Sequence, residues 1–270
     1  MFYNAKSGTL ELENGQMDYI CFGRGSRVLI MLPGLGESLQ SIKGTALPMA
    51  VMYREFAKDH RVYLFSRRAP MSPGVTTRDM ARDQAEAMEI LGIGRADVVG
   101  VSMGGMIAQW LAVDHPERVD RLVLTVTAAE PNPILRESIE EWVALASAGK
   151  AAEFMRSNLR LIYSEDYCRK NGWMAPIVGR FTKFTDRFFV QADACRTHDA
   201  AGELHRIRAK TMVIGGEQDR VVGGGASRQI AAAIPGAVLK MYPQWGHGLY
   251  EEERSFNRTV RAFLAADREL

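Results

Sequence analysis

The residues best suited to chemistry lie in the stretch GVSMGG, which spans Gly100 to Gly105. Ser102 follows a valine-rich run and precedes a segment with helical spacing, with a glycine two residues to either side. A sharp strand-to-helix turn of this kind exposes a serine hydroxyl above the edge of a sheet. Because a serine hydroxyl is a weak nucleophile at neutral pH, it needs a base and donors for an oxyanion. We predict Ser102 as the nucleophile and the N–H group of Met103 as one such donor.

Five histidines are candidates for the base that accepts the serine proton. His247 stands in the loop PQWGHG after a predicted strand, where Gly246 and Gly248 leave its ring room to reach Ser102. We therefore predict His247 as the base, with an exposed loop histidine as the competing interpretation. The other four are expected to be exposed or to cap helices: His60, His115, His198 and His205.

A catalytic histidine needs a carboxylate on its second ring nitrogen to fix the tautomer that accepts from serine. Asp219, in GGEQDRVV, follows the next-to-last predicted core strand and precedes His247 by 28 residues. Glu217 lies two residues closer to that strand and is an alternative. We predict Asp219 as the acid, against the interpretation of an ordinary aspartate in a turn.

These residues need a scaffold whose strands end at one edge. Six short apolar runs are typical of strands buried on both faces, namely Arg27–Leu32, Arg61–Ser66, Ala96–Val101, Arg121–Val126, Thr211–Gly216 and Ala237–Tyr242. Segments with helical spacing alternate with them, which predicts a parallel sheet with helices on both faces. Near the start, GTLELENGQMDYICFG predicts two antiparallel edge strands joined at Asn14 and Gly15.

Residues 131–208 interrupt this alternation, since they contain helical patches but no convincing buried strand. We expect them to form a helical cap inserted between core strands, with residues 1–130 and 209–270 forming the core. Its large apolar side chains are candidates for a substrate pocket: Trp142, Phe154, Trp173, Met174, Phe181, Phe184 and Phe188. Packing on each other and on the core is the alternative role for each of them.

The chain resembles the α/β-hydrolase superfamily, and within it the capped serine esterases. The resemblance runs from about Arg27 to the C-terminus and rests on GVSMGG, DHPERVDRLVLT, TMVIGGEQDRVV and QWGHGLYEE. It implies the chain order serine, acid, histidine, which Ser102, Asp219 and His247 supply. It also makes Glu130 an alternative acid, because some relatives carry the acid at that place.

By the same resemblance, the second oxyanion donor is the N–H group of Leu35 in LPGLGES. The sequence departs from the usual His-Gly start with Pro33 and Gly34, and proline has no N–H to donate, although the glycines still permit a tight turn. The loop FSRRAPMSPG also departs from its relatives and leaves the pocket shape open. An acidic substrate, an internal carboxylate and solvent are the alternative partners of Arg67 and Arg68.

The resemblance implies a carboxylesterase-like serine hydrolase that cleaves a small-molecule acyl ester through an acyl-enzyme, with no metal or organic cofactor. Hydrolysis of thioesters, amides or carbon–carbon bonds and acyl transfer stay open, since a fold does not determine its substrate. A lyase that uses the same three residues for proton transfer and a non-hydrolytic ligand receptor are the alternatives from other classes.

Composition limits the classes of binding partner and the cellular compartment that we expect for this protein. A net charge of +2 over 270 residues argues against a nucleic acid or an anionic membrane as partner. Three widely spaced cysteines favour free thiols over a disulfide framework or a zinc site. The N-terminal residues lack the pattern of a signal peptide and no apolar run is typical of a membrane span, so we expect a cytoplasmic protein; its oligomeric state stays open.

Overall fold

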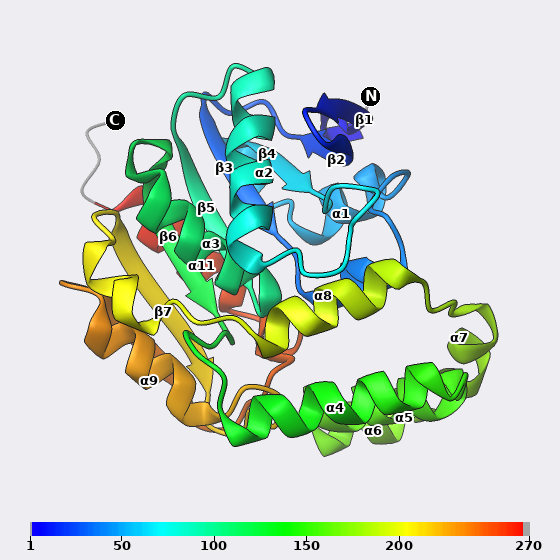
Figure 1. The fold of residues 1–270 in the computed structure, drawn as a ribbon. Coiled ribbons are helices and arrows are strands. Elements are labelled where there is room, and N and C mark those ends of the chain that lie inside the picture. The colour runs from blue at the N-terminus through cyan, green and yellow to red at the C-terminus, as the bar shows by residue number, and fades with distance from the viewer. Residues whose placement is uncertain (1, 267–270) are drawn as a thin grey trace.

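The centre of the molecule is an eight-stranded sheet with the strand order β1-β2-β4-β3-β5-β6-β7-β8 (Figure 1). This computed structural model describes residues 2–266. β2 pairs antiparallel with both β1 and β4, and all other neighbours are parallel. The strands are β1 (Lys6–Leu12), β2 (Gly15–Phe22), β3 (Arg27–Leu32), β4 (His60–Phe65), β5 (Ala96–Val101), β6 (Val119–Thr125), β7 (Lys210–Gly216) and β8 (Val238–Tyr242). The predicted α/β fold with a mostly parallel sheet is confirmed.

The N-terminal hairpin turns one residue earlier than the Asn14–Gly15 pair indicated. Leu12 pairs directly with Gly15, so the two connecting residues are Glu13 and Asn14. Gly15 is the first residue of β2, and a Cβ atom there would lie only 2.6 Å from the carbonyl oxygen of Ala69. The glycine therefore permits the close approach of a neighbouring chain segment, which its place in the sequence does not show.

Helices cover both faces of the sheet (Figure 1). Buried side chains of α2, α3 and α9 share one core with one face of the strands, and those of α1 and α11 share a second core with the other face. The helices are α1 (Ala46–Met52), α2 (Thr77–Ile90), α3 (Met103–Asp114), α4 (Pro133–Ser147), α5 (Ala151–Ile162), α6 (Glu165–Asn171), α7 (Ala175–Phe181), α8 (Asp186–Arg196), α9 (Gly224–Ala233), α10 (Leu249–Glu252) and α11 (Phe256–Ala265).

The two-sided core explains the apolar run before Ser102. Every residue of β5 is buried; Val98 belongs to the core under α3, and Val99 belongs to the core on the opposite face. Side chains alternate between faces along a strand, so a central strand covered on both sides has apolar residues on both faces, and the one charged residue of β5, Asp97, is buried against His60. The continuous valine-rich sequence is the consequence.

Five helices, α4 to α8, connect β6 to β7, and we call them the insertion helices. Figure 1 shows them gathered at one end of the sheet, with α4, α5 and α6 side by side. The first of them begins where the Asn132 side chain accepts the N–H of Leu135 at 3.0 Å, with Pro133 in the first helical position. Both features are typical of a helix N-terminus.

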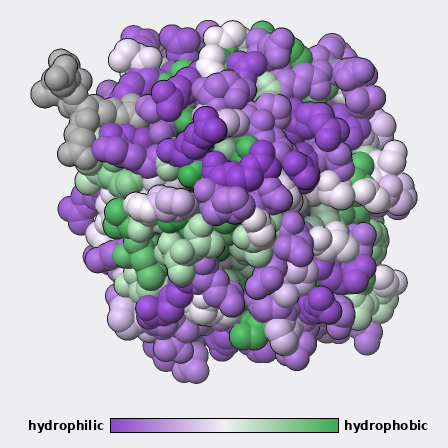
Figure 2. Space-filling model, turned by 60° about the vertical axis from the view of Figure 1, so that its left-hand side comes forward, coloured by the Kyte–Doolittle hydropathy of each residue, from purple (hydrophilic) through white to green (hydrophobic). Residues whose placement is uncertain are grey.

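The outer surface is largely polar. On the face drawn in Figure 2, hydrophilic residues cover most of the molecule and hydrophobic residues form smaller groups between them. Across residues 2–266, no helix combines the length and the apolar character that crossing a membrane requires.

Candidate active site

The turn after β5 holds Ser102 in a backbone conformation that few side chains adopt. Ser102 has φ 54° and ψ −122° and precedes the first residue of α3. A Cβ atom on Gly104 would lie 1.9 Å from the carbonyl oxygen of Leu32, and one on Gly105 would lie 2.6 Å from the Thr127 side chain. Only glycine permits this close packing of α3 against the sheet. The strained conformation of Ser102 persists because the tightly packed backbone around it holds it in place.

His247 connects the serine to a carboxylate. Its Nε2 lies 3.0 Å from Oγ of Ser102, and its Nδ1 lies 2.8 Å from Oδ2 of Asp219. The His247 loop is fixed by the insertion helices, since the N–H of Gly248 donates to the carbonyl oxygen of Ile162 at 2.7 Å. The structure thus brings the three predicted residues into a line along which a proton can move from serine to histidine.

The second oxygen of Asp219 is also occupied. Oδ1 accepts the N–H groups of Val221 at 2.8 Å and Val222 at 2.9 Å, so the buried carboxylate has one orientation. The two alternative acids lie elsewhere, because Glu217 forms an ion pair with Arg228 and Glu130 is exposed. Asp219 is therefore the carboxylate that the structure places against His247.

Two helix N-termini meet beside Ser102. Met103 is the first residue of α3, and Leu35 is the first residue of the 3-10 helix Leu35–Leu39. N–H groups at these positions have no acceptor within their own helix. A Cβ atom on Gly34 would lie 3.3 Å from the Cβ of Ser102, so the Leu35 turn contacts the serine. Both predicted donors lie at a position suited to receive a negative oxygen, and Pro33 does not prevent the turn.

Two of the remaining histidines, His60 and His198, are buried, whereas His205 is exposed and His115 is half-buried at the C-terminal end of α3. His60 is buried and its Nε2 lies 3.1 Å from Oδ2 of Asp97. His198 is also buried, and burial lowers its pKa to about 3. Its ring contacts the Thr77 hydroxyl at 2.8 Å, so its role is structural packing. The expectation that both would be exposed or cap helices is wrong, because each has a specific polar partner inside the core.

Arg67 and Arg68 have internal partners. Arg68 forms an ion pair with Asp83 at 3.1 Å. Arg67 is buried, where desolvation lowers its pKa, and it donates to the carbonyl oxygen of Pro33 in the turn before Leu35. Of the alternatives for this pair, the structure favours internal partners over an acidic substrate.

A buried carboxylate links the 3-10 helix Leu35–Leu39 to the insertion helices. Glu37 forms an ion pair with Arg187 of α8, and it also accepts from the hydroxyl of Ser66. Arg187 further donates to the carbonyl oxygen of Arg67 at 3.1 Å. This network is absent from the sequence prediction, since its members come from three distant segments and none belongs to a recognisable motif.

A cavity of about 430 Å³ opens at Ser102 and His247. Of the seven apolar candidates from residues 131–208, Trp142, Phe154 and Phe188 line it. Phe184 packs on the far side of Phe154, with ring centroids 4.9 Å apart.

The other three candidates lie outside this cavity. Trp173 is 67% exposed, Met174 41% and Phe181 80%. They belong to the short 3-10 helix Gly172–Met174 and to α7. These turns direct their large side chains to the surface of the insertion helices. Their assignment to the pocket therefore does not agree with the structure.

Several polar residues of the same cavity were not among the predicted residues. Tyr53, Tyr163, Tyr250 and Glu251 line it together with the apolar side chains. Tyr163 donates to Oε2 of Glu251 at 2.8 Å. Desolvation, and after it the charge of Glu251, raises the pKa of all three tyrosines, so their hydroxyls stay protonated donors. Proximity in the sequence was the one available signal, because Glu251 follows His247 by four residues and lies in the short helix α10 after the His247 loop.

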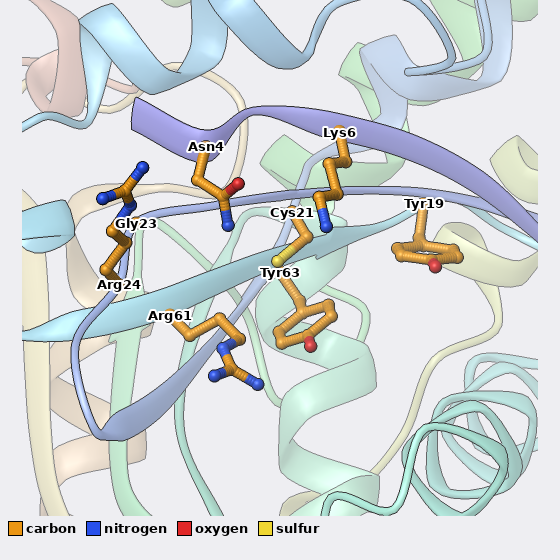
Figure 3. Close-up of a pocket in the computed structure, with 8 residues that line it drawn as sticks. All are labelled: Asn4, Lys6, Tyr19, Cys21, Gly23, Arg24, Arg61 and Tyr63. Carbon is orange, nitrogen blue, oxygen red and sulfur yellow. The ribbon is translucent and has the colours of Figure 1, made fainter. Parts of the chain in front are cut away.

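A second cavity, of about 370 Å³, lies over β1, β2 and β4. Figure 3 shows residues that line it, among them Lys6, Tyr19, Cys21, Arg61 and Tyr63. It contains none of the predicted site residues. Among residues 2–266, no group of three or more histidine, cysteine or carboxylate side chains is placed to hold a metal ion.

Comparisons with known proteins agree with this geometry. The family model described as the alpha/beta hydrolase fold matches residues 27–154, and one described as TAP-like protein matches residues 186–268. A protein of Caulobacter sp. strain K31 named "Putative carbamate hydrolase RutD" is 28% identical over 246 residues, covering 89% of this chain and 91% of its own length.

Two further relatives extend the comparison. A 2-hydroxymuconate semialdehyde hydrolase of Pseudomonas putida is 32% identical over 185 residues, which cover 66% of this chain and 65% of that protein. The crystal structure of MGS-M2, an alpha/beta hydrolase enzyme from a Medee basin deep-sea metagenome library, superposes with a TM-score of 0.85 at 22% identity, covering 97% of this chain and 99% of the other. The chain therefore belongs to the α/β-hydrolase superfamily and is a hydrolase.

Proposed function

We propose that the protein is a serine hydrolase that cleaves small-molecule acyl esters through an acyl-enzyme. The observation that carries the proposal is the contact series from Ser102 through His247 to Asp219, with distances of 3.0 and 2.8 Å. Its direct connection to a cavity of about 430 Å³ leaves room for a small substrate at the serine.

The proposed reaction has two steps. His247, held by Asp219, takes the proton of Ser102 as the hydroxyl attacks the acyl carbonyl. The oxyanion accepts hydrogen bonds from the N–H groups of Leu35 and Met103, and His247 then protonates the leaving alcohol. Water, activated by the same histidine, hydrolyses the acyl-enzyme and regenerates the serine.

The insertion completes the proposed site. We assign residues 131–208 as a cap that shapes the acyl pocket through Trp142, Phe154 and Phe188, which line the cavity. The ion pair between Arg187 and Glu37 joins this cap to the oxyanion turn. Substrate contacts on the cap and catalytic donors on the core are therefore mechanically connected.

A fluorophosphonate probe followed by intact mass spectrometry tests the proposed nucleophile. We expect one adduct per wild-type chain and none on Ser102→Ala, while circular dichroism shows that both are folded. Ser227→Ala, which alters a buried serine outside the cavity, is the matched control and should label like the wild type. Adduct formation on folded Ser102→Ala would refute the assignment.

A substrate panel tests the bond that is cleaved. It contains matched acyl esters, thioesters and amides, with a carbamate and 2-hydroxymuconate semialdehyde added because of the names of the two relatives. We expect the highest kcat/KM for an ester. A carbamate or the semialdehyde that exceeds every ester by tenfold would replace the ester in this proposal.

A further inference from the structure

The charge of the substrate cavity is unbalanced. Two carboxylates line it, Glu37 and Glu251, and within residues 2–266 no lysine or arginine does. Glu37 is neutralised by its ion pair with Arg187, which approaches from outside the cavity. Glu251 receives hydrogen bonds from tyrosine, and the ion pairs of the described residues include none to its carboxylate. The cavity therefore carries a negative charge that the protein itself does not compensate.

Glu251 lies among aromatic rings. Tyr53, Tyr163 and Tyr250 are half-buried and line the same cavity as Glu251. Glu251 itself is exposed, so a ligand can reach its carboxylate. A carboxylate beside several tyrosine rings combines ion pairing with cation–π attraction, and this combination binds ammonium groups.

The same surroundings are unfavourable for an anion. An anionic ligand would face Glu251 without a lysine or arginine in the cavity lining to balance it. Desolvation among the tyrosines raises the pKa of Glu251, while the hydrogen bonds from Tyr163 and Tyr250 lower it. Desolvation deprives the charged carboxylate of favourable interactions with water, and a cation bound here would replace them.

We propose that this hydrolase selects esters that carry an ammonium group, and that Glu251 with Tyr53, Tyr163 and Tyr250 forms the subsite that binds the cation. The inference rests on the proposed ester hydrolysis, because it places the charged end of the substrate in the cavity that opens at Ser102. Glu251 is a binding residue in this proposal and takes no part in the chemistry.

Two isosteric ester pairs test the proposal, since the members of each pair differ only in charge. Acetylcholine is compared with 3,3-dimethylbutyl acetate, which places the cation in the alcohol. The p-nitrophenyl esters of 4-(trimethylammonio)butanoate and 5,5-dimethylhexanoate place it in the acyl group. We expect kcat/KM to favour the cationic member of at least one pair by about tenfold, as expected for an ion pair and cation–π contacts at a partly exposed site.

Substitution identifies the residue responsible. Glu251→Gln keeps the size and an acceptor for Tyr163 but removes the charge, so the ratio of kcat/KM between the cationic and the neutral ester should fall to near one. Glu252→Gln is the matched control, because Glu252 does not line the cavity and a glutamine oxygen still accepts from Ser164. Its ratio should stay at the wild-type value.

The results separate this inference from the proposed function. Equal kcat/KM within both pairs, or a preference that Glu251→Gln leaves unchanged, would overturn the cation subsite while leaving ester hydrolysis intact. Cleavage of none of the four esters would contradict the proposed function instead. Calorimetric binding of choline against 3,3-dimethylbutanol then decides the subsite, and equal affinity of the two would overturn it.

Discussion

The Asp219→Asn substitution tests the proposed triad because the surroundings of Asp219 determine how an asparagine amide must point. Oδ1 accepts N–H groups of Val221 and Val222 at 2.8 and 2.9 Å, and Oδ2 faces Nδ1 of His247 at 2.8 Å. An asparagine keeps the two N–H bonds only with its carbonyl oxygen in the Oδ1 position. Its NH₂ group then faces Nδ1, which must accept, and the ring proton moves to Nε2 opposite Ser102.

That tautomer cannot accept the serine proton. The equivalent change in a serine protease lowers kcat by about 10⁴-fold, which corresponds to about 5.4 kcal/mol at 1.36 kcal/mol per tenfold. We expect a loss of this order, with little change in fold because shape and the two N–H bonds are retained. Glu130→Gln removes an exposed carboxylate and is the matched control, with kcat expected within about twofold of the wild type.

Steady-state hydrolysis of a p-nitrophenyl ester measures both variants, after circular dichroism has shown equal folding. Labelling by a fluorophosphonate should slow in parallel in Asp219→Asn, since the probe also requires an activated serine. If Asp219→Asn stays within tenfold of the wild type, the tautomer argument is refuted. An inactive Glu130→Gln would transfer the role of the acid to the residue after β6.

Three further changes have expected outcomes. Phe188→Leu should alter the kcat/KM ratio between short and long acyl esters, whereas Phe181→Leu, at a side chain outside the cavity, should leave it unchanged. Gly104→Ala should prevent stable folding, because its Cβ would lie 1.9 Å from a carbonyl oxygen, and Gly36→Ala, with nothing within 4 Å, should keep the wild-type melting temperature. The buried ring of His198 has its pKa lowered to about 3, so the unfolded chain binds the proton first as the pH falls from about 6.5. In the wild type, this group should lower the free energy of unfolding by about 1.4 kcal/mol for each pH unit between about pH 6 and pH 3. His198→Gln should abolish that contribution, as measured by urea denaturation at several pH values, and an unchanged pH slope would contradict this reasoning.

Local signals were sufficient to place the catalytic candidates. Central strands read as continuous apolar runs because both of their faces are covered, as β5 shows. Parallel strands end at one edge, so residues that follow β5, β7 and β8 must come close in space. The position of Ser102, Asp219 and His247 at that edge could therefore be predicted without any knowledge of long-range contacts.

The pocket could not be predicted in the same way. Phe188 and Phe181 are the same residue type in neighbouring helices, yet one lines the cavity and the other is 80% exposed. Which side of an insertion helix faces the core depends on how the helices pack together, and no strand edge determines it. A prediction based on residue type alone therefore assigned both phenylalanines to the pocket.

The burial of polar residues could not be predicted for a related reason. The pair Arg67–Arg68 has the composition of a solvated loop, but Arg67 is buried against the carbonyl oxygen of Pro33. A charged side chain is buried only where partners from other segments satisfy it. Those partners, with Glu37 and Arg187 among them, lie far apart in the sequence and become neighbours only in the folded chain.

The same distinction separates the reaction from its substrate. The reaction depends on residues at strand ends, whose positions follow from the sheet, and these are the residues that a motif identifies. The charge of the cavity depends on Glu251, on a tyrosine of α10 and on the tyrosines that directly follow α1 and α5, which meet through tertiary packing. A serine hydrolase is therefore recognisable from sequence, whereas its preference for a cationic, neutral or anionic ester requires the arrangement of side chains around the folded cavity.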